Sequence, residues 1–373
     1  MDFDSRPILV FWETTRRCGL ACRHCRASAI REPLPGELTT AEATGFVESL
    51  GRFGPPSPVL IATGGDVLER RDLDAMLAVA RAGRTPVALA PSVTALLTDE
   101  RIAALRLAGV KVVSISLDGA TPATHDGVRG VEGHFDETVA AIARLRRHGM
   151  VVQVNTVAMR ATVDELAAVA HLVGALGAAI WEVFFLVRVG RGTGLEELTP
   201  EENEHVCHFL VDASRHGFIV RTVEAPFFRR VAAQRASGEP PPDGGLYERL
   251  VRELGDGRGP VKAQTKGTRD GRGIVFVAHD GDVYPSGFLP LSLGNVTRDD
   301  LVELYRDHPL LRRIRAAEFS GRCGECSYRD LCGGSRARAF AASGDPLGED
   351  PACSYVSGTA RAGSGARAPD RLR

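Results

Sequence analysis

The sequence has almost no net charge and no long apolar run. Its 373 residues include 46 Lys and Arg against 47 Asp and Glu, which leaves a net charge of −1. This balance provides no basic surface for duplex nucleic acid and no polybasic attraction to a membrane. No apolar stretch approaches the roughly 20 residues of a membrane-spanning helix. We therefore expect neither nucleic acid nor a membrane among the partners.

The N-terminus lacks the pattern of a secretory signal. Residues 1–7 contain Asp2 and Asp4, and no basic stretch is followed there by an apolar one. The first predicted strand begins at about residue 7, so we expect no peptide-recognition domain before it, and no cobalamin-binding domain is visible. These features predict a cytoplasmic protein. A hydrophobic content of 44% is enough for a core of full size.

Cysteine is used sparingly, and its positions are clustered. A reducing cytosol does not favour disulfides, so two clusters far apart in the sequence predict two metal sites instead. Cys207 stands alone in an apolar helical stretch, where a buried core residue is expected. The other seven cysteines form an N-terminal and a C-terminal group: Cys18, Cys22 and Cys25, then Cys323, Cys326, Cys332 and Cys353.

Short apolar runs alternate with amphipathic stretches over about the first half of the chain. This alternation predicts βαβ units around a parallel sheet. Six units favour an α/β fold, a partial (β/α)6 TIM-type barrel, while a doubly wound sheet is an alternative that periodicity leaves open. Strands are expected at residues 7–13, 59–63, 86–90, 110–117, 151–157 and 181–186, and helices at 72–82, 98–108, 137–148 and 164–176.

After a further helical stretch, the amino-acid composition of the sequence changes. Differences in composition divide the chain into four expected parts. Residues 1–233 are expected to form the barrel domain, and 234–272, rich in Gly, Pro and charge, a flexible connection. Residues 273–355 contain a hairpin signal at Asp280-Gly281, a short helix and the second cysteine group. Residues 356–373 are small, polar and basic, and are expected to be a disordered tail.

The N-terminal cysteines have the spacing C-x3-C-x2-C directly after the first predicted strand. Three thiolates on one loop can hold three irons of a [4Fe–4S] cubane and leave the fourth iron open for a small ligand. A structural zinc site would need a fourth protein ligand, which His24 could supply only if it turned away from the direction its neighbours favour. The spacing therefore favours an iron–sulfur cluster.

This motif and its place resemble the radical SAM superfamily, whose signature is C-x3-C-x-φ-C, with His24 at the aromatic position. The resemblance covers about residues 7–190. It implies that the open iron binds the amino and carboxylate groups of S-adenosylmethionine. Reductive cleavage then gives methionine and a 5′-deoxyadenosyl radical, which abstracts hydrogen from the substrate. It also implies a reductant such as flavodoxin or ferredoxin.

The resemblance further assigns polar residues at the ends of later strands to the cosubstrate. Gly64-Gly65-Asp66 resembles the family's Gly-Gly-Glu motif, which contacts the amino group of the methionine moiety, although Asp66 is one methylene shorter. Ser116-Leu-Asp118-Gly resembles a segment near the ribose or carboxylate. Taken singly, each position also fits a turn, a helix cap or an ion pair. The expected cosubstrate contacts are Gly64, Gly65, Asp66, Ser92, Ser116, Asp118, Arg129 and Asn155.

The C-terminal cysteines follow the pattern C-x2-C-x5-C with a distant fourth member. Four thiolates can hold zinc or a [4Fe–4S] cluster, and the spacing leaves both possible. Residues 273–355 resemble the SPASM or twitch extension of radical SAM enzymes, which implies auxiliary clusters. Ser286 and Ser335 occupy positions where that family often has cysteine. We therefore expect one auxiliary [4Fe–4S] cluster on Cys323, Cys326, Cys332 and Cys353, with no open iron.

These features predict a radical SAM oxidoreductase or maturase. Arg336-Ala-Arg338 after Cys332-Gly-Gly resembles enzymes of haem d1 and alternative haem assembly, and arginines suit carboxylate substrates; a solvated helix face is the ordinary alternative. The expected reaction is oxidative modification or decarboxylation of a cofactor-like or small-metabolite substrate. One alternative is a maturase of a ribosomally made peptide or protein. Others are a two-cluster electron carrier without SAM chemistry and a zinc-stabilised binding module.

Overall fold

A computed structural model describes residues 2–264 and 267–355, so the expected disordered tail at 356–373 lies outside the described residues. Seven strands run parallel and pair in sequence order around a curved sheet. This order confirms the α/β partial barrel and excludes a doubly wound sheet, in which the order would reverse. The strands are β1 (Leu9–Glu13), β2 (Val59–Thr63), β3 (Val87–Leu89), β4 (Val112–Ser116), β5 (Val151–Ala158), β6 (Ile180–Phe185) and β7 (Ile219–Val223).

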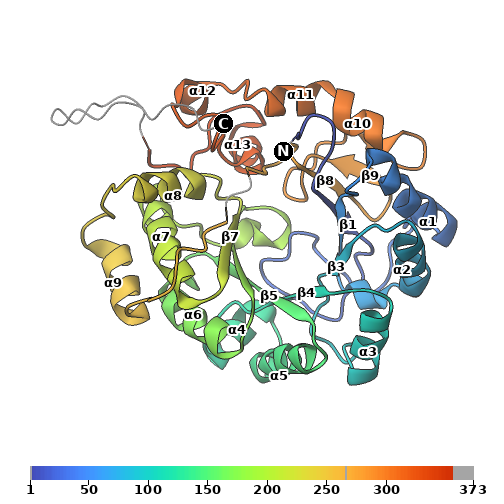
Figure 1. Cartoon of the computed structure of the whole chain (residues 1–373), viewed down its shortest axis with the longest axis horizontal. Coiled ribbons are helices and arrows are strands. Elements are labelled where there is room, and N and C mark those ends of the chain that lie inside the picture. Colours follow the sequence, from blue (N-terminus) through green and yellow to red (C-terminus); the bar gives the residue numbers. More distant parts are fainter. Residues whose placement is uncertain (1, 265–266, 356–373) are drawn as a thin grey trace.

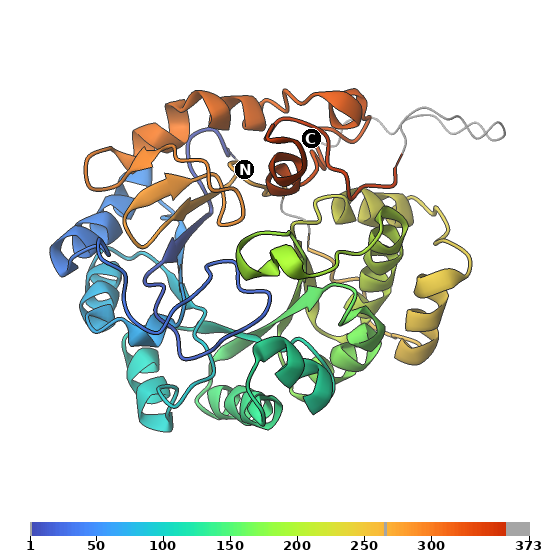
Figure 2. The ribbon, with the colours of Figure 1, turned by 180° about the vertical axis from the view of Figure 1, so that it is seen from behind.

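Helices cover the outer face of the sheet and leave its inner face open (Figures 1 and 2). On β5, Val152, Val154 and Thr156 point outward and are fully buried, whereas Gln153 and Asn155 point inward and are partly exposed. Period-2 alternation therefore gives the barrel a polar interior. The outer helices are α1 (Thr40–Ser49), α2 (Leu73–Ala82), α3 (Asp99–Leu107), α4 (Pro122–Arg129), α5 (His134–Arg147), α6 (Leu166–Ala175) and α7 (Pro200–Ala213).

Local sequence sets where these helices begin. Thr39 and Thr199 each accept a bond from the backbone three residues on, and Glu42 and Glu202 return bonds to the caps. These capping boxes satisfy donors that a helix N-terminus leaves free. None of the helices in the described part of the chain has an apolar segment long enough to cross a bilayer.

The C-terminal part extends the same sheet. β8 (Ile274–Val277) pairs parallel with β1 and forms the expected hairpin with β9 (Asp282–Tyr284), which pairs with β10 (Gly294–Asn295). The sheet is not closed, and the C-terminal helices lie between its two edges, near the top of Figure 1. These helices are α10 (Leu301–Asp307), α11 (Pro309–Arg315), α12 (Gly321–Glu325) and α13 (Arg336–Ser343).

The expected flexible connection at 234–272 is wrong over part of its length. α8 (Phe228–Ala236) runs into it, and α9 (Gly245–Leu254) lies within it. Leu246, Leu250 and Leu254 recur every four residues and are buried as α9 packs on α6 and α7. Gly- and Pro-rich flanks concealed this short amphipathic helix. β7 was also missed, because only Val220 of that strand is buried.

Candidate functional site

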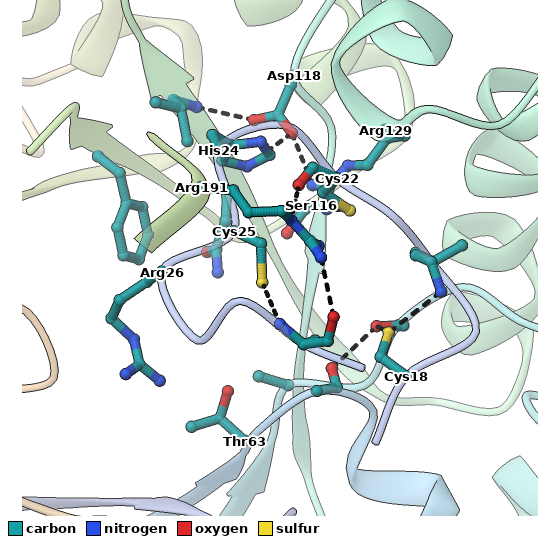
Figure 3. A pocket seen from close by; sticks show the side chains of 18 of the residues that line it. Cys18, Cys22, His24, Cys25, Arg26, Thr63, Ser116, Asp118, Arg129 and Arg191 are labelled. Carbon is teal, nitrogen blue, oxygen red and sulfur yellow. Dashed lines mark hydrogen bonds and ion pairs between the residues drawn. The ribbon is translucent and has the colours of Figure 1, made fainter. Parts of the chain in front are cut away.

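The N-terminal cysteines lie on the loop that follows β1, at the carboxyl ends of the strands. The cavity there encloses about 1200 Å³ including its open mouth, and Cys18, Cys22 and Cys25 all line it (Figure 3). The carboxyl ends of the strands are also where active sites of β/α barrels lie. The cysteines therefore lie where the fold places its chemistry.

The three sulfur atoms are surrounded by hydrogen-bond donors rather than joined in a disulfide. Cys18 Sγ accepts from Leu20 N at 3.3 Å and lies 3.5 Å from Ser92 Oγ. Cys25 Sγ accepts from Ala29 N at 3.4 Å. N–H groups aimed at sulfur stabilise the thiolate form that an iron–sulfur cluster requires. The donor set therefore fits a cluster held by three protein ligands.

The two glycines after β2 hold the cysteine loop in place. Gly65 N donates to Thr15 O at 2.7 Å, and Asp66 N donates to Arg17 O at 2.7 Å. A Cβ at Gly65 would lie 2.2 Å from Arg17 O, and one at Gly64, where φ is +149°, would lie 2.5 Å from Thr15 O. The close approach that needs glycine here is thus to the loop backbone itself.

Asp66 does not line the cavity, unlike the other residues expected at the cosubstrate. It has no exposed surface, and its carboxylate accepts from Thr94 Oγ1 at 2.8 Å, Leu68 N at 3.1 Å and Ser92 N at 3.3 Å. Burial raises its pKa. Because Asp lacks one methylene of Glu, its carboxylate stays behind Ser92 and positions that residue. A direct contact between Asp66 and the cosubstrate is therefore not supported.

Ser92, Ser116 and Asn155 do line the cavity, together with both glycines. Ser116 ends β4 and is the register partner of Asn155 on β5. Asn155 Oδ1 accepts from Gln153 Nε2 at 2.8 Å, one step deeper along the same inner face. Adjacent strands therefore bring these polar groups together as the sequence predicted, opposite the cysteine loop.

Asp118 and Arg129 form a buried ion pair beneath Cys22. Arg129 Nη2 lies 2.7 Å from Asp118 Oδ2, and Arg129 Nη1 lies 3.5 Å from Cys22 Sγ. His24 Nε2 lies 3.5 Å from the same carboxylate oxygen (Figure 3). Burial opposes ionisation of Asp118, but the charge of Arg129, and then that of His24, outweighs it and lowers its pKa. Both members of the pair are therefore charged, and they fix the position of one cysteine.

Two histidines support Asp118 from behind. Asp118 N donates to His125 Nδ1 at 3.1 Å, and His125 Nε2 lies 2.9 Å from His134 Nδ1. His134 Nε2 in turn faces Val93 O at 3.0 Å. All of these hydrogen bonds can form only if both imidazole rings are neutral and each ring donates from Nε2. Burial, followed by the charge of Arg129, lowers the pKa of His125 to about 4, which agrees with that state.

The sequence analysis missed other residues that line the cavity, including charged and aromatic ones. Arg191, after β6, donates to Cys22 O at 2.9 Å and to Ala29 O at 2.8 Å. A Cβ at Gly190 would lie 2.3 Å from Arg26 O, so this loop clamps the cysteine loop. The pattern Gly190-Arg191-Gly192 at a strand end was the available signal. Among the missed lining residues are Arg26, Phe184, Arg191 and Phe288.

Arg26 joins the cysteine loop to the C-terminal hairpin. Its guanidinium lies 2.7 Å from Glu13 Oε2 and donates to Gly287 O at 3.1 Å. His279, between β8 and β9, lies 3.0 Å from the other oxygen of Glu13. The guanidinium also stacks over the ring of Phe276 at 4.7 Å. The C-terminal extension therefore forms one wall of the cavity.

The C-terminal cysteines also have sulfur atoms surrounded by backbone donors. Cys323 Sγ accepts from Asp350 N, Cys326 Sγ from Tyr328 N and Cys332 Sγ from Gly334 N, each at 3.4 Å. Burial raises the pKa of Cys332 to about 12 and that of Cys353 to about 11. Such buried thiols become thiolates when a metal binds them. Cys207 is fully buried in the core, as expected.

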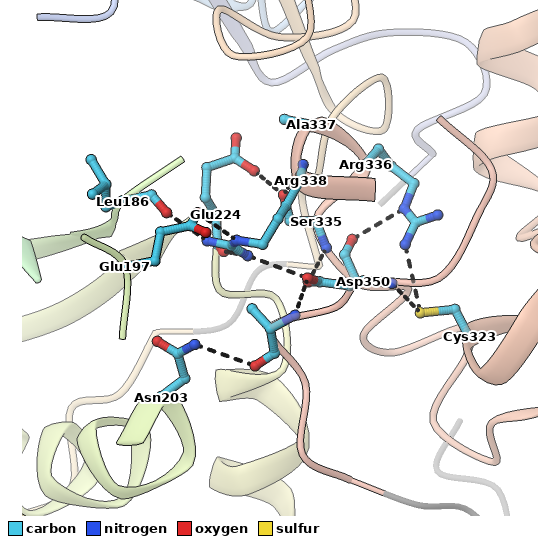
Figure 4. Close-up of polar contacts among 12 residues, drawn as sticks. Leu186, Glu197, Asn203, Glu224, Cys323, Ser335, Arg336, Ala337, Arg338 and Asp350 are labelled. Atoms are coloured by element: carbon cyan, nitrogen blue, oxygen red, sulfur yellow. Dashed lines mark hydrogen bonds and ion pairs between the residues drawn. The ribbon is translucent and has the colours of Figure 1, made fainter. Parts of the chain in front are cut away.

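Ser286 and Ser335 are engaged in hydrogen bonds within the protein. Ser335 has 1% of its surface exposed, donates to the carboxylate of Glu224 and caps α13 by accepting from Arg338 N at 3.0 Å (Figure 4). Ser286 Oγ accepts from Phe288 N at 3.3 Å. Both hydroxyl groups therefore have a local structural role that does not require a metal.

The chain matches the model of the Radical SAM superfamily over residues 12–173. It is 37% identical to the AdoMet-dependent heme synthase of Methanosarcina barkeri (strain Fusaro / DSM 804), over 94% of this chain and 97% of that protein. This chain belongs to the radical SAM superfamily. It is also 30% identical to the pre-heme d1 synthase of Dinoroseobacter shibae, over 93% and 86%, and 29% identical to the mycofactocin maturase MftC of Mycobacterium tuberculosis (strain H37Rv), over 93% and 83%.

Solved structures support the same fold. Streptococcus suis SuiB bound to the precursor peptide SuiA has a TM-score of 0.71 at 14% identity, covering 94% of this chain and 76% of that one. Native anSMEcpe with bound AdoMet has a TM-score of 0.67 at 16% identity, covering 92% and 93%. As a radical SAM enzyme, this chain binds a [4Fe–4S] cluster and S-adenosylmethionine. The alternative of an electron carrier without SAM chemistry is therefore excluded.

Proposed function

We propose that this radical SAM enzyme oxidatively decarboxylates propionate side chains of an iron porphyrin. The observation that carries the proposal is the 37% identity to an AdoMet-dependent heme synthase, which extends over nearly the whole of both chains. Heme has vinyl groups where related porphyrins have propionates. Conversion of a propionate to a vinyl group therefore requires the loss of one hydrogen atom, one electron and carbon dioxide.

The cluster with its bound S-adenosylmethionine supplies, when present, the radical that takes this hydrogen atom. We propose that Cys18, Cys22 and Cys25 hold the cluster. We also propose that Gly64, Gly65, Ser92, Ser116, Asp118, Arg129 and Asn155 form the cosubstrate side of the cavity, with Asp118 and Arg129 acting mainly by fixing Cys22. The buried pair beneath Cys22 and the loop clamp at Gly190 support this assignment.

Four side chains of the cavity lining suit a flat, carboxylate-bearing substrate. Phe184 and Phe288 lie with ring centroids 6.4 Å apart, and both line the cavity with Arg26 and Arg191. One guanidinium nitrogen of Arg191 is buried without a hydrogen-bond partner in the described structure. Aromatic faces suit a macrocycle, and a guanidinium pairs with a carboxylate through two parallel bonds. These groups would hold the propionates while the barrel excludes water.

We propose that the four C-terminal cysteines hold one auxiliary [4Fe–4S] cluster, which accepts the electron released from the substrate. No three His, Cys, Asp or Glu side chains among the described residues converge closely enough for a single metal ion. A cubane binds each thiolate to a separate iron, and these cysteines supply one thiolate for each of its four irons. Flavodoxin or ferredoxin would supply the electron that starts each turnover, in the reducing cytoplasm.

The test is turnover of an iron porphyrin that has propionates at the positions of the heme vinyl groups. Reconstituted enzyme with S-adenosylmethionine and a reductant should form the vinyl product and 5′-deoxyadenosine in equal amounts. Arg191→Gln should raise KM for this porphyrin about tenfold, as expected for a charged hydrogen bond, while Arg249→Gln, at an exposed ion pair, should not. Formation of 5′-deoxyadenosine without any change in the porphyrin would contradict the proposal.

Peptide maturation is the second candidate, because the mycofactocin maturase covers 93% of this chain. The cavity mouth is open, and an extended peptide could reach it. The two functions differ in what accelerates cleavage of S-adenosylmethionine. If a precursor peptide, rather than the porphyrin, stimulates formation of 5′-deoxyadenosine, the peptide function is the correct one.

A further inference from the structure

Three arginines from distant parts of the chain gather around the C-terminal cysteines without an acidic partner. Arg336 has no exposed surface, Arg269 has 4% and Arg229 is partly buried. Within residues 2–264 and 267–355, no carboxylate forms an ion pair with any of them. They donate instead to backbone carbonyl groups, namely those of Gly334, Pro346 and Gly348, of Ile314 and Asp330, and of Thr268 and Leu331.

Other arginines nearby are paired with acids in the ordinary way. Arg338, on the same helix as Arg336, lies 3.4 Å from Asp350 and 3.5 Å from Glu197. Arg230, next to Arg229, lies 2.5 Å from Glu204. A buried cation without an anion costs several kcal/mol. Asp270 lies nearby and accepts from Arg336 N at 3.0 Å, but it forms no ion pair with any of the three guanidinium groups. A negatively charged group bound by the cysteines would therefore supply the counter-charge that these arginines lack.

The glycine pair after Cys332 admits two of these guanidinium groups. A Cβ at Gly333, where φ is +71°, would lie 2.8 Å from Arg269 Nη1. A Cβ at Gly334, where φ is +62°, would lie 2.5 Å from Arg336 Nη2 and 3.0 Å from Cys323 Sγ. Both guanidinium groups also stack on one ring, that of Phe319, at 4.4 Å and 5.2 Å. The backbone is thus shaped so that positive charge reaches the cysteines.

Arg336 makes the direct contact. Its Nη2 lies 3.6 Å from Cys323 Sγ, on the side of the sulfur that Asp350 N also faces (Figure 4). A [4Fe–4S] cluster with four thiolates has a net negative charge, and reduction adds one more. Hydrogen bonds to the ligand sulfurs and nearby positive charge therefore stabilise the reduced form and raise the reduction potential.

We infer that Arg336, backed by Arg269 and Arg229, raises the reduction potential of the auxiliary cluster so that it can accept the electron from the oxidised substrate. This inference rests on the proposed function, because it requires that the four cysteines hold a redox-active cluster. It assigns a redox role to the Arg336 position, for which the sequence suggested substrate binding or a solvated face. The burial of Arg336 excludes both of those roles in the described structure.

The test is a redox titration of the auxiliary cluster followed by electron paramagnetic resonance. The catalytic cysteines are replaced by Ala, so that only the auxiliary signal remains. Arg336→Gln should lower the midpoint potential. Arg336→Lys keeps the positive charge but loses the planar, forked set of guanidinium N–H donors, so it should lower the midpoint potential less. Arg269→Gln should also lower it and serves as the second variant if Arg336→Gln binds no iron. The control is Arg322→Gln, which removes an exposed charge paired with Glu349 beside Cys323 and should cause a smaller shift.

The outcomes separate this inference from the proposed function. Unchanged potentials in Arg336→Gln and Arg269→Gln, with iron content intact, would overturn the inference and leave the cluster assignment standing. A shift in Arg322→Gln as large as that in Arg336→Gln would also overturn it. If the protein with the catalytic cysteines replaced holds zinc or no metal, the cluster assignment itself is wrong.

Discussion

The two cysteine groups of this enzyme differ in what surrounds them. The N-terminal group lies on an open loop, and its sulfur atoms line a cavity that polar side chains share. Its nearest buried charges, Asp118 and Arg129, neutralise each other at 2.7 Å. The C-terminal group lies on and around helices α12 and α13, where three of its four cysteines are partly exposed. It can supply four thiolates, which would close the site to further ligands, and buried arginines without an ion-pair partner lie against it. One environment is built to admit ligands and the other to hold negative charge.

This difference separates two tasks that iron–sulfur chemistry often combines. An open site with a neutral surrounding can bind a cosubstrate and expose it to a second reactant. A closed site with excess positive charge favours a reduced cluster and cannot coordinate substrate. The Arg338 side chain joins the two regions, since it donates to Leu186 O, at the cavity, and to Glu224 O. The experiments below test how independent the two sites are.

The largest effect is expected from removal of the N-terminal thiolates. The variant with Ala at Cys18, Cys22 and Cys25 should form no detectable 5′-deoxyadenosine, because no open iron remains to bind S-adenosylmethionine. It should retain about half of roughly eight irons, taking four for each cubane. Iron analysis and product assays check both points. Retention of less than a tenth of the iron would show that the C-terminal cysteines hold no iron–sulfur cluster.

Adding a single methyl group at Gly65 should disturb the N-terminal cysteine site and leave the C-terminal one intact. We expect this difference to be almost as large as that caused by removing the N-terminal thiolates. Gly65→Ala places Cβ 2.2 Å from Arg17 O, so the cysteine loop must move. Overpacking against a fixed backbone costs about 1–3 kcal/mol, and we expect loss of the catalytic cluster with the auxiliary cluster retained. Gly45→Ala, with open space around its Cβ, is the matched control. Full catalytic iron in Gly65→Ala would mean that the loop is not held in the way described.

Much of the open site could be predicted from the sequence, because its residues follow predicted strands directly. The cysteine spacing, the glycine pair and Ser116 all lie at carboxyl strand ends, where a parallel sheet brings them together. Asp66 is the exception: its position along the chain was right, but the direction of its side chain depends on Thr94 and on its shorter length. The direction in which such a side chain points is decided by packing, and a linear sequence motif does not indicate it.

The surroundings of the closed site could not be predicted in this way. Arg229 and Arg269 are 40 residues apart in the chain, and Arg269 and Arg336 are 67 apart. Nothing in their local sequence indicates burial. Arg336-Ala-Arg338 suggested two equivalent arginines, yet one contacts a cysteine and the other an aspartate. Helix α9 was lost for a similar reason, since Gly-rich flanks outweighed three spaced leucines.

A smaller effect is expected from breaking the ion pair of the open site. Asp118→Asn leaves Arg129 buried without a negative partner, and this should lower the free energy of unfolding by about 3–5 kcal/mol. Asp99→Asn removes an exposed partner of His148 and should change the free energy of unfolding much less, because surface ion pairs contribute little. Anaerobic denaturant unfolding measures both. Equal, small losses in the two variants would show that the charge of Asp118 does not stabilise the loop.

The smallest effect is expected from a moderate decrease in pH, which should again affect the two cysteine sites differently. His125 is neutral in the folded protein, with its pKa lowered from 6.5 to about 4, so the unfolded chain binds more protons below neutrality. The stability that His125 contributes is therefore present above pH 6.5 and falls as the pH drops toward 4, by about 1.4 kcal/mol at pH 5.5. His125→Asn keeps an acceptor for Asp118 N but does not titrate, so its unfolding free energy should fall less between pH 7.5 and 5.5.

Because the hydrogen-bonded histidines support Cys22 through Asp118 and Arg129, mild acid should release catalytic iron from the wild type before auxiliary iron. Identical acid responses of wild type and His125→Asn would show that another group controls the loop.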